Sequence, residues 1–458
     1  ASAQATVEEL HLLGRLVRGL GAENIDHRLR HADFDTRGGV RWLGTSIASL
    51  STLDRAFVVG SFLRKDHPLF ALRLREAARR GAEVSSLHAL ADDWLLPVAH
   101  RLTAAPATWV AALAGVAAAV AAEKGVAAPM ATEPDATARS IAASLLGGAR
   151  KAVLLGNAAV QHPQAAALRA LAEFIAEHTG ASCGTLGDAG NAVGAQLVGA
   201  QPGPGGLNAG QMLAKPLKAY LLFGTEAVLD AADPAQAAAA LAGAQMVVSF
   251  SAFKSANLEH ADVLLPIAPF TETSGTFVNA EGRVQGFFGA VKPRGDARPA
   301  WKVLRVLGTM LALPGFGFES SDEVRAQALG DLDTLPQRLS AASAAAPAAA
   351  SAPAPAPAGL ERIADVPIYS SDPIVRRAPA LQATADARPP RVGMPTALWQ
   401  ALGLQEGAEV HLQQGSTSVQ LPAYLDASLA PTAVRVPAGH PATAALGPMF
   451  GAIAVEKA

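Results

Sequence analysis

Residues 55–88 decide the fold, and they read RAFVVGSFLRKDHPLFALRLREAARRGAEVSSLH. Residues 56–59 are an apolar run without alternation, which is typical of a strand buried on both faces, and the run ends at Gly60-Ser61. His67-Pro68 opens a helical stretch, Gly81 ends it, and another strand follows directly. A strand, a helix and a strand in this order predict one crossover unit of a parallel sheet.

The same unit recurs twice further along the chain. A second copy covers residues 153–180 and a third covers residues 220–248, and in both a proline opens the helix. Their first strands also end in glycine and a small polar residue, at Gly156-Asn157 and Gly224-Thr225. These repeats predict an α/β class fold, a doubly wound body of parallel sheets.

Other segments extend this prediction. Residues 6–9 have capping-box spacing before an amphipathic helix that ends near Gly21. We expect one more buried strand at residues 262–266, a polar connection without regular structure at residues 270–285, and a helix at residues 300–313.

The composition changes at residues 340–359, which are almost entirely Ala, Pro and Ser. Such a segment buries little surface and favours extended conformations, so we predict an interdomain linker. It would join an α/β body of residues 1–339, with room for two interleaved α/β domains, to residues 360–458. Short strands predicted around Val410, Val419 and Val434 make this last part a small β-rich domain.

The overall composition excludes several classes of protein. Half of the 458 residues are hydrophobic and 17% are charged, which favours packed cores over disorder. The net charge is −2 and Lys and Arg are scattered along the sequence, so no basic patch for binding nucleic acid is expected. Cys183 is the only cysteine, so the chain cannot form an internal disulfide or hold an iron–sulfur cluster by itself.

One long apolar stretch, residues 104–122, is long enough to be considered as a membrane span. It is dominated by alanine and contains Pro106, Thr108 and Gly115, so we predict a packed core helix and no membrane span. The chain begins with Ala, and no charged and apolar leader pattern follows, so we expect no intact signal peptide.

Few residues are candidates for chemistry. His27 and His31 have the spacing of a metal pair near Asp26, but Arg28 and Arg30 between them oppose a divalent cation. We therefore favour a hydrogen-bonded structural cluster. Cys183 is more typical of a small buried apolar residue than of a nucleophile.

The glycine turns and a polar cluster each allow two interpretations. The turns at Gly60, Gly156 and Gly224 could bring backbone N–H groups to a phosphate, but no nucleotide fingerprint is present, which favours plain tight turns. An acid and base pair could be drawn from the polar residues of 259–283. Such residues more often hold turns by hydrogen bonds, and we expect Arg283 to pair with Glu272 or Glu281. The polar residues concerned are Glu259, His260, Asp262, Glu272, Asn279, Glu281 and Arg283.

Several stretches resemble a known family. Residues 259–266 (EHADVLLP), 272, 275–279 (GTFVN) and 281–285 (EGRVQ) resemble the large subunits of molybdopterin oxidoreductases. Residues 24–30 (NIDHRLR), 190–195 (GNAVGA) and 297–307 (ARPAWKVLRVL) look like the large iron–sulfur subunit, or G subunit, of bacterial NADH-quinone oxidoreductase, respiratory complex I. The resemblance covers about residues 7–330 and, more weakly, the β-rich tail.

The resemblance implies a molybdopterin-oxidoreductase-type body that has lost its cofactor and its chemistry. The family's iron–sulfur modules would lie upstream of Ala1. Active relatives carry Asn-Pro in a glycine-serine loop that touches the pterin dinucleotide, whereas Phe62-Leu63 stand here. Residues 402–436 resemble a shortened form of the β-barrel that closes over the pterin.

We therefore expect a non-catalytic scaffold with no catalytic, cofactor-binding or metal residues and no cofactor of its own. Its partners would be other subunits of the complex I peripheral arm, at the cytoplasmic face of the bacterial inner membrane. One alternative is an active, formate dehydrogenase-like molybdopterin enzyme, which would have only Cys183 as a thiol. Another is a soluble module that binds a nucleotide at the three glycine turns.

Overall fold

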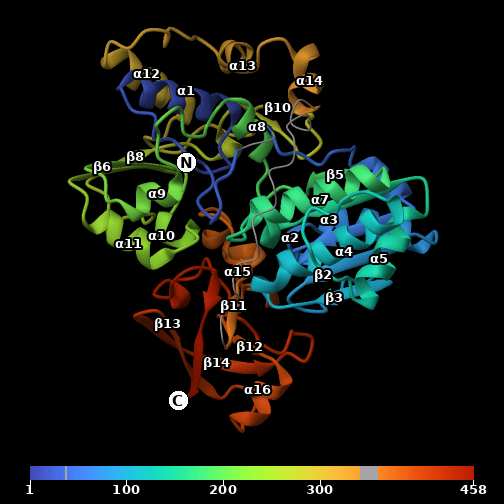
Figure 1. The fold of residues 1–458 in the computed structure, drawn as a ribbon. Helices are drawn as coiled ribbons and strands as arrows, with labels where there is room; N and C mark the ends of the chain where they lie inside the picture. Colours follow the sequence, from blue (N-terminus) through green and yellow to red (C-terminus); the bar gives the residue numbers. More distant parts are fainter. Residues whose placement is uncertain (37–38, 341–358) are drawn as a thin grey trace.

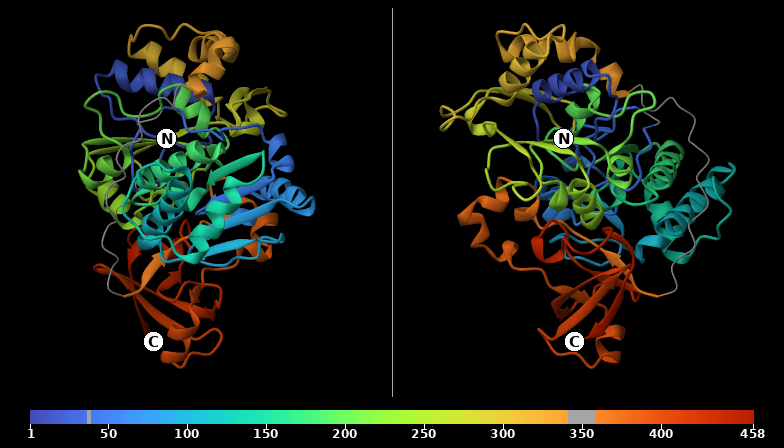
Figure 2. Two further views of the ribbon diagram at one scale, coloured as in Figure 1. Left: turned by 45° about the vertical axis from the view of Figure 1, so that its right-hand side comes forward. Right: turned by 90° about the vertical axis from the view of Figure 1, so that its left-hand side faces the viewer.

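The computed structural model describes residues 1–36, 39–340 and 359–458 (Figure 1). Apart from its end residues Ser340 and Gly359, the predicted linker lies outside the described residues. The elements form a group around a five-stranded sheet, a second group around a three-stranded sheet, and a β-rich C-terminal group. Figure 2 shows the C-terminal group at the end of the molecule opposite the helices of residues 300–340.

The five-stranded sheet is parallel throughout and has the order β3-β2-β1-β4-β5. From the central β1 the chain moves outward through β2 and β3, and then to the other side through β4 and β5. This reversal makes the carboxyl ends of β1 and β4 a topological switch point. The strands are β1 (Arg55–Val59), β2 (Glu83–His88), β3 (His100–Thr103), β4 (Lys151–Leu155) and β5 (Ser182–Thr185).

Helices cover both faces of this sheet, which explains the apolar runs without alternation. Val58 and Leu154 point to the face covered by α3, and Phe57 and Val59 point to the opposite face, with α4, α5 and α7. The doubly wound fold predicted from residues 55–88 is therefore confirmed. The helices are α2 (Leu63–Asp66), α3 (Pro68–Arg79), α4 (Trp109–Lys124), α5 (Ala136–Leu146), α6 (Asn157–Val160) and α7 (Ala165–Thr179).

The apolar stretch around α4 is a core helix. Residues 106–124 are long and apolar enough to cross a membrane by length and composition, but 67% of their apolar window is buried inside the protein. Trp109 and Val116 are fully buried, and α4 packs between α5 and α7. Alanine at most positions allows these helices to approach closely.

The three-stranded sheet is also parallel, with the order β6-β7-β8. One face packs on α9, α10 and α11, and the carboxyl half of the other packs on α1 and α12 through Phe223 and Phe250. The predicted N-terminal capping box is present, because Glu9 N–H donates to Thr6 Oγ1 and Thr6 N–H donates to Glu9 Oε2. The elements are α1 (Val7–Gly19), α9 (Ala209–Ala214), β6 (Ala219–Phe223), α10 (Ala227–Asp230), α11 (Pro234–Ala242), β7 (Met246–Ser251), β8 (Val263–Pro266) and α12 (Ala300–Met310).

Residues 270–285 do not form the irregular connection that we expected. They contain β9 (Gly275–Val278) and the start of β10 (Val284–Phe287), an antiparallel hairpin. Glu8 of α1 holds it, because its carboxylate accepts hydrogen bonds from Thr276 N–H (2.9 Å) and Oγ1 (2.6 Å). This contact joins residues far apart in the chain, so no local pattern indicates it. The remaining helices of this region are α8 (Ala192–Leu197), α13 (Ser321–Leu329) and α14 (Leu335–Ser340).

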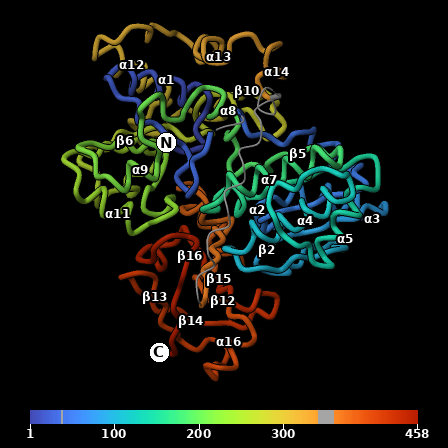
Figure 3. The backbone as a smooth tube through the Cα atoms, viewed as in Figure 1, coloured from blue at the N-terminus to red at the C-terminus, as the bar shows by residue number. Residues whose placement is uncertain are grey.

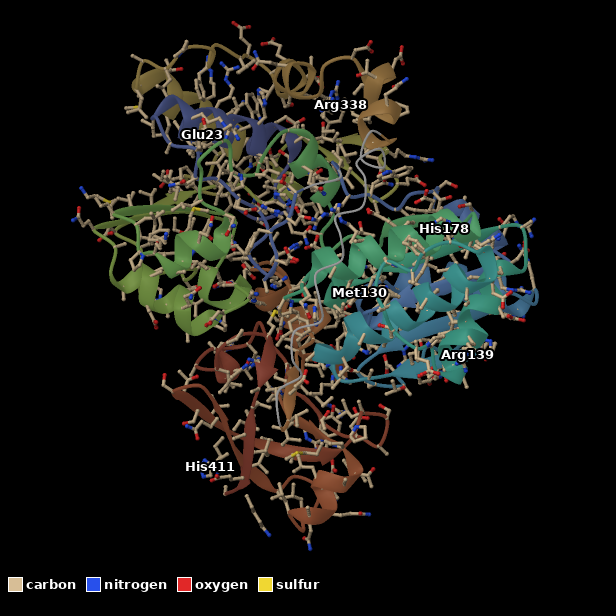
Figure 4. All side chains as sticks on the ribbon, in the orientation of Figure 1. Glu23, Met130, Arg139, His178, Arg338 and His411 are labelled. Carbon is tan, nitrogen blue, oxygen red and sulfur yellow. The ribbon has the colours of Figure 1, made fainter. Side chains whose placement is uncertain are left out.

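The C-terminal group is built on a seven-stranded mixed sheet, a half-barrel with the order β16-β11-β15-β12-β14-β13-β17. The chain end lies in this group, far from the N-terminus (Figure 3), and His411 is exposed on β13 (Figure 4). The strands predicted around Val410, Val419 and Val434 are β13, β14 and β15, whereas the short strands β11, β12, β16 and β17 were missed. The elements are β11 (Glu361–Ile363), α15 (Pro379–Gln382), β12 (Val392–Met394), α16 (Thr396–Ala401), β13 (Glu409–Gln414), β14 (Thr417–Leu425), β15 (Ala433–Arg435), β16 (Phe450–Ala452) and β17 (Ala454–Lys457).

Arg362 of β11 is fully buried in this sheet. It pairs with backbone carbonyls and one amide rather than with a carboxylate, and burial lowers the pKa of its guanidinium to about 10. Its acceptors are Val436 O, Pro437 O, Gly447 O, Pro448 O and Gln414 Oε1.

We predict that Arg362→Met lowers the free energy of unfolding by about 3 kcal/mol, because several buried carbonyls lose their donor. Urea titration followed by circular dichroism measures this loss. Arg391→Met is the matched control, because Arg391 is partly exposed and pairs with Glu406 at the surface, where a pair contributes about 1 kcal/mol or less. Equal losses in the two variants would contradict the role given to Arg362.

Candidate functional site

A cleft lies at the switch point of the five-stranded sheet. It is formed by the loops that follow β1, β4 and β5 and by residues 364–371 of the C-terminal group, and it encloses about 880 Å³ when its open mouth is counted. We call it the switch-point cleft. Its polar lining residues are Gln4, Arg30, Lys65, Asp66, Asn157, Gln161, Asp188, Asp365 and Ser371.

The glycine turns after β1 and β4 pack against each other. A Cβ added to Gly156 would lie 2.3 Å from Ser61 Cβ, and one added to Gly60 would lie 2.5 Å from the backbone nitrogen of Ala159. Gly60, with φ of 62°, also accepts a hydrogen bond from Ala159 N–H. The turns are therefore closed by protein atoms, as the tight-turn interpretation predicts.

Phe62 follows the Gly60-Ser61 turn at the end of β1. The side chain is 2% exposed, meets the ring of His88 edge-on at 4.5 Å and lies 4.9 Å beneath the guanidinium of Arg435. Arg435 forms a two-point ion pair with Asp365. The C-terminal group therefore covers this loop with an aromatic and ionic contact.

Carboxyl groups outnumber cations in the lining of the switch-point cleft, three to two. Its two cations are already paired, Arg30 with Asp230 at 2.8 Å and Lys65 with Asp386 at 2.5 Å. Asp66 has an enclosed Oδ2 without a hydrogen-bond partner in the described part of the chain. Burial, reinforced by a nearby carboxylate, raises the pKa of Asp66 to about 7.

A second charged cluster closes the loop after β6. Arg376 donates to Glu226 and Asp230, and Arg377 donates to Glu226 through two nitrogens. Arg30 also donates to Asp230 and to Ser371 O. We call Arg30, Glu226, Asp230, Arg376 and Arg377 the ion-pair lock, since it joins the N-terminal segment, the three-stranded sheet and residues 371–377.

The histidines singled out from the sequence do not share a helix face, because residues 26–31 have no helical structure. His31 Nε2 pairs with Asp188 at 2.9 Å, and His27 Nδ1 meets Ala200 O at 2.9 Å. Asp26 is occupied by Arg28. The cluster is hydrogen-bonded, and within residues 1–36, 39–340 and 359–458 no group of three or more His, Cys, Asp or Glu could hold a metal ion.

The other candidates have structural contacts. Cys183 packs against the apolar core, and burial raises the pKa of its thiol to about 12, which opposes thiolate chemistry. Arg283 pairs with Glu281 and not with Glu272. The side chain of Asn279 accepts N–H groups of its own turn, and Asp262 accepts Val247 N–H. The polar residues of 259–283 thus hold turns.

Asp66 and the ion-pair lock were not found from the sequence. Asp66 is one of many acidic residues, and its burial depends on residues 364–371, which follow it by about three hundred positions. The two-arginine sequence at Arg376-Arg377, in a stretch with few apolar residues, was the one available signal for the lock.

The residues that line the switch-point cleft do not fit a pterin dinucleotide, the cofactor that the family resemblance raises. Asp66 could hydrogen-bond a heterocycle, but the phosphates would meet a lining whose two cations are already paired. The one thiol, Cys183, lies within the strand β5 opposite Val153, and it does not line the cleft. No reaction step is therefore assigned to such a group.

We predict that Gly156→Ala lowers the free energy of unfolding by 3 kcal/mol or more, on the order of a severe overpacking defect, because the new Cβ would overlap the turn after β1. Chemical denaturation of the purified variant measures the loss. Gly317→Ala is the control, since its added Cβ meets no atom within 4 Å and should change stability little. A Gly156→Ala protein as stable as the control would refute the close packing of the two turns.

We also predict that Asp66→Asn is more stable than the parent protein above pH 7, by about 2–4 kcal/mol. A raised carboxyl pKa means that the folded protein holds a proton that the unfolded chain loses between about pH 4 and pH 7. Stability therefore falls as pH rises through that range, and the amide removes this loss. Denaturation curves at pH 5 and pH 8 measure the difference, with Asp93→Asn as an exposed control. A stability gain of the same size at both pH values would contradict this account.

Comparisons with known proteins show which family the chain belongs to. A family profile described as molybdopterin oxidoreductase matches residues 1–310. The chain is 29% identical over 312 residues to the G subunit of NADH-quinone oxidoreductase from Mycobacterium bovis, covering 63% of this chain and 38% of the relative. It is 43% identical over 53 residues to a Staphylococcus aureus protein provisionally named a formate dehydrogenase, covering 12% and 5% of the two chains.

The chain thus spans less than two fifths of the length of these relatives. Acetylene hydratase from Pelobacter acetylenicus has the same fold, with a TM-score of 0.62, 13% sequence identity, and coverage of 97% of this chain and 82% of that one. Because the family profile covers well over half of its residues, the chain belongs to the molybdopterin oxidoreductase family.

Proposed function

We propose that this chain is the catalytically silent body of the large iron–sulfur subunit, the G subunit, of a bacterial NADH-quinone oxidoreductase. The observation that carries the proposal is that the two cations of the switch-point cleft are already bound by the protein's own carboxylates. Arg30 and Lys65 are paired, and the ion-pair lock closes the loop after β6. The 29% identity to the Mycobacterium bovis protein over 312 residues supports the choice of complex.

In this role the chain would brace a cluster-bearing module and contact neighbouring subunits of the peripheral arm. Electron transfer from NADH to quinone would run through iron–sulfur clusters held elsewhere, in the upstream part of the full-length subunit and in its partners. We place the protein at the cytoplasmic face of the inner membrane, attached through the complex. We also propose the division into a body of residues 1–339, a linker of residues 340–359 and a β-rich domain of residues 360–458.

The second candidate is an active molybdopterin-dependent oxidoreductase of the formate dehydrogenase type. The enclosed, unpaired Oδ2 of Asp66 favours it, because a buried acceptor without a donor suits a heterocycle that carries N–H groups. The short match to the Staphylococcus aureus protein supports it as well. The weakness of this candidate is the acidic lining described above.

Metal analysis of the purified chain by inductively coupled plasma mass spectrometry distinguishes the two candidates. We expect neither molybdenum nor iron in stoichiometric amount, because Cys183, the one thiol, packs against the apolar core and the cations of the cleft are paired. Acid oxidation of the same sample should release no fluorescent pterin. One molybdenum per chain together with a released pterin would overturn the scaffold proposal and establish the second candidate, and one iron per chain would overturn it as well.

A further inference from the structure

A second cleft lies at the carboxyl edge of the three-stranded sheet, and nothing in the proposed function uses it. The loops after β6, β7 and β8 form its floor, and residues 2–9, Phe277 and residues 372–375 form its walls. It encloses about 1030 Å³ when the space open to solvent is counted. We call it the aromatic cleft, and it shares only Gln4 with the lining of the switch-point cleft.

The lining of the aromatic cleft is mainly apolar and contains four rings. Phe270 at the mouth is 52% exposed, and Ile374 beside it is 37% exposed. Apolar groups left in water at the rim of a concave site are those that a ligand would cover. The apolar lining residues are Phe223, Phe253, Ile267, Pro269, Phe270, Phe277, Pro373, Ile374 and Val375.

The charges of the aromatic cleft define what it can accept. Its lining contains no Lys, Arg or His, and its two ionisable groups are Glu9 and Asp372. Asp372 is occupied, because its Oδ1 accepts the N–H groups of Ile374 and Val375. Glu9 accepts Thr6 N–H through Oε2, and burial raises the pKa of its carboxyl group to about 7. An anionic ligand would find no counter-ion in this lining.

The cleft is held open by the sheet itself. Ile267 N–H donates to Ser251 O, and Gly224 N–H donates to Phe250 O, so the loops continue the ladder of the strands. On the outer side, the guanidinium of Arg377 lies 5.0 Å from the ring of Phe253 while it remains bonded to Glu226. The ring of Phe253 is therefore held in place before any ligand arrives, which lowers the entropic cost of binding.

We propose that the aromatic cleft binds an uncharged, flat aromatic small molecule that hydrogen-bonds to the carboxyl group of Glu9. The four phenylalanine rings supply stacking and edge contacts, and the carboxyl group of Glu9 orients the polar side of the ligand. Nucleotides and fatty acids are disfavoured because the lining has no cation. The site is separate from the switch-point cleft, so this inference does not depend on the scaffold proposal.

Fluorescence titration with N-phenyl-1-naphthylamine tests the proposal, because this dye is neutral, aromatic and carries one N–H group. We expect saturable binding of one dye per chain, with a Kd on the order of 10 µM for a ligand of this size. Its anionic counterpart, 8-anilinonaphthalene-1-sulfonate, has the same rings and should bind at least tenfold more weakly. Equal binding of the two dyes, or binding that does not saturate, would overturn the proposal.

Two variants locate the binding. Ile374→Asp places a charge at the mouth on an exposed side chain and should weaken dye binding by tenfold or more. Leu332→Asp is the matched control, because Leu332 is 46% exposed and does not line the aromatic cleft, and it should bind as the parent does. Phe270→Ala should weaken binding severalfold. If the two aspartate variants bind the dye equally while circular dichroism shows both to be folded, the site assignment is wrong.

Discussion

The ion-pair lock is the constraint on which the arrangement of the three groups depends. Burying a charged side chain costs several kcal/mol unless a partner of opposite charge meets it with good geometry. Asp230 is 8% exposed and is met by Arg30 and Arg376, while Glu226 is met by Arg376 and Arg377. Any displacement of residues 371–377 would leave these charges buried and unpaired, so the lock specifies one position for the C-terminal segment more than it adds net stability.

The same constraint accounts for the state of the two sheet edges. Parallel sheets leave their carboxyl edges as natural binding places, because the loops there point away from the strands. In the five-stranded sheet the turns at this edge contact each other, Phe62 lies beneath Arg435, and the switch-point cleft opens beside them. The two cations of its lining bind the protein's own carboxylates.

Local physics made much of the fold predictable. The apolar run at residues 56–59 predicted a buried strand, and the capping-box spacing of Thr6 and Glu9 predicted the start of α1, as found. The run at residues 220–223 does form a strand, but Leu221 is exposed because helices cover that face of the three-stranded sheet only in part. The β9–β10 hairpin was missed, because its strands are four residues long and are held by Glu8 from outside the segment. Short strands carry too few residues for a period of two to be recognised.

The candidate site was much less predictable than the fold, because the residues that form it are far apart in the sequence. Arg30 and Asp230 are 200 positions apart, and Arg376 follows Asp230 by 146 positions. No local pattern encodes such pairs, and an arginine that will bind a phosphate looks the same in sequence as one that will bind an aspartate. Even the favoured turn interpretation for Gly60 and Gly156 came from a missing fingerprint and not from the contact between them.

The two sheet edges therefore differ in a way that composition could not reveal. At the first edge, protein side chains pair the two cations, while Asp66 Oδ2 and Asn157 Oδ1 are enclosed oxygens without a partner among the described residues. At the second edge, the lock removes Arg376 and Arg377 from the cleft by binding them to Glu226 and Asp230, which leaves a lining of rings and carboxylates. One set of ion pairs thus has two effects: it anchors the C-terminal segment, and it makes the neighbouring cleft apolar enough to favour uncharged molecules.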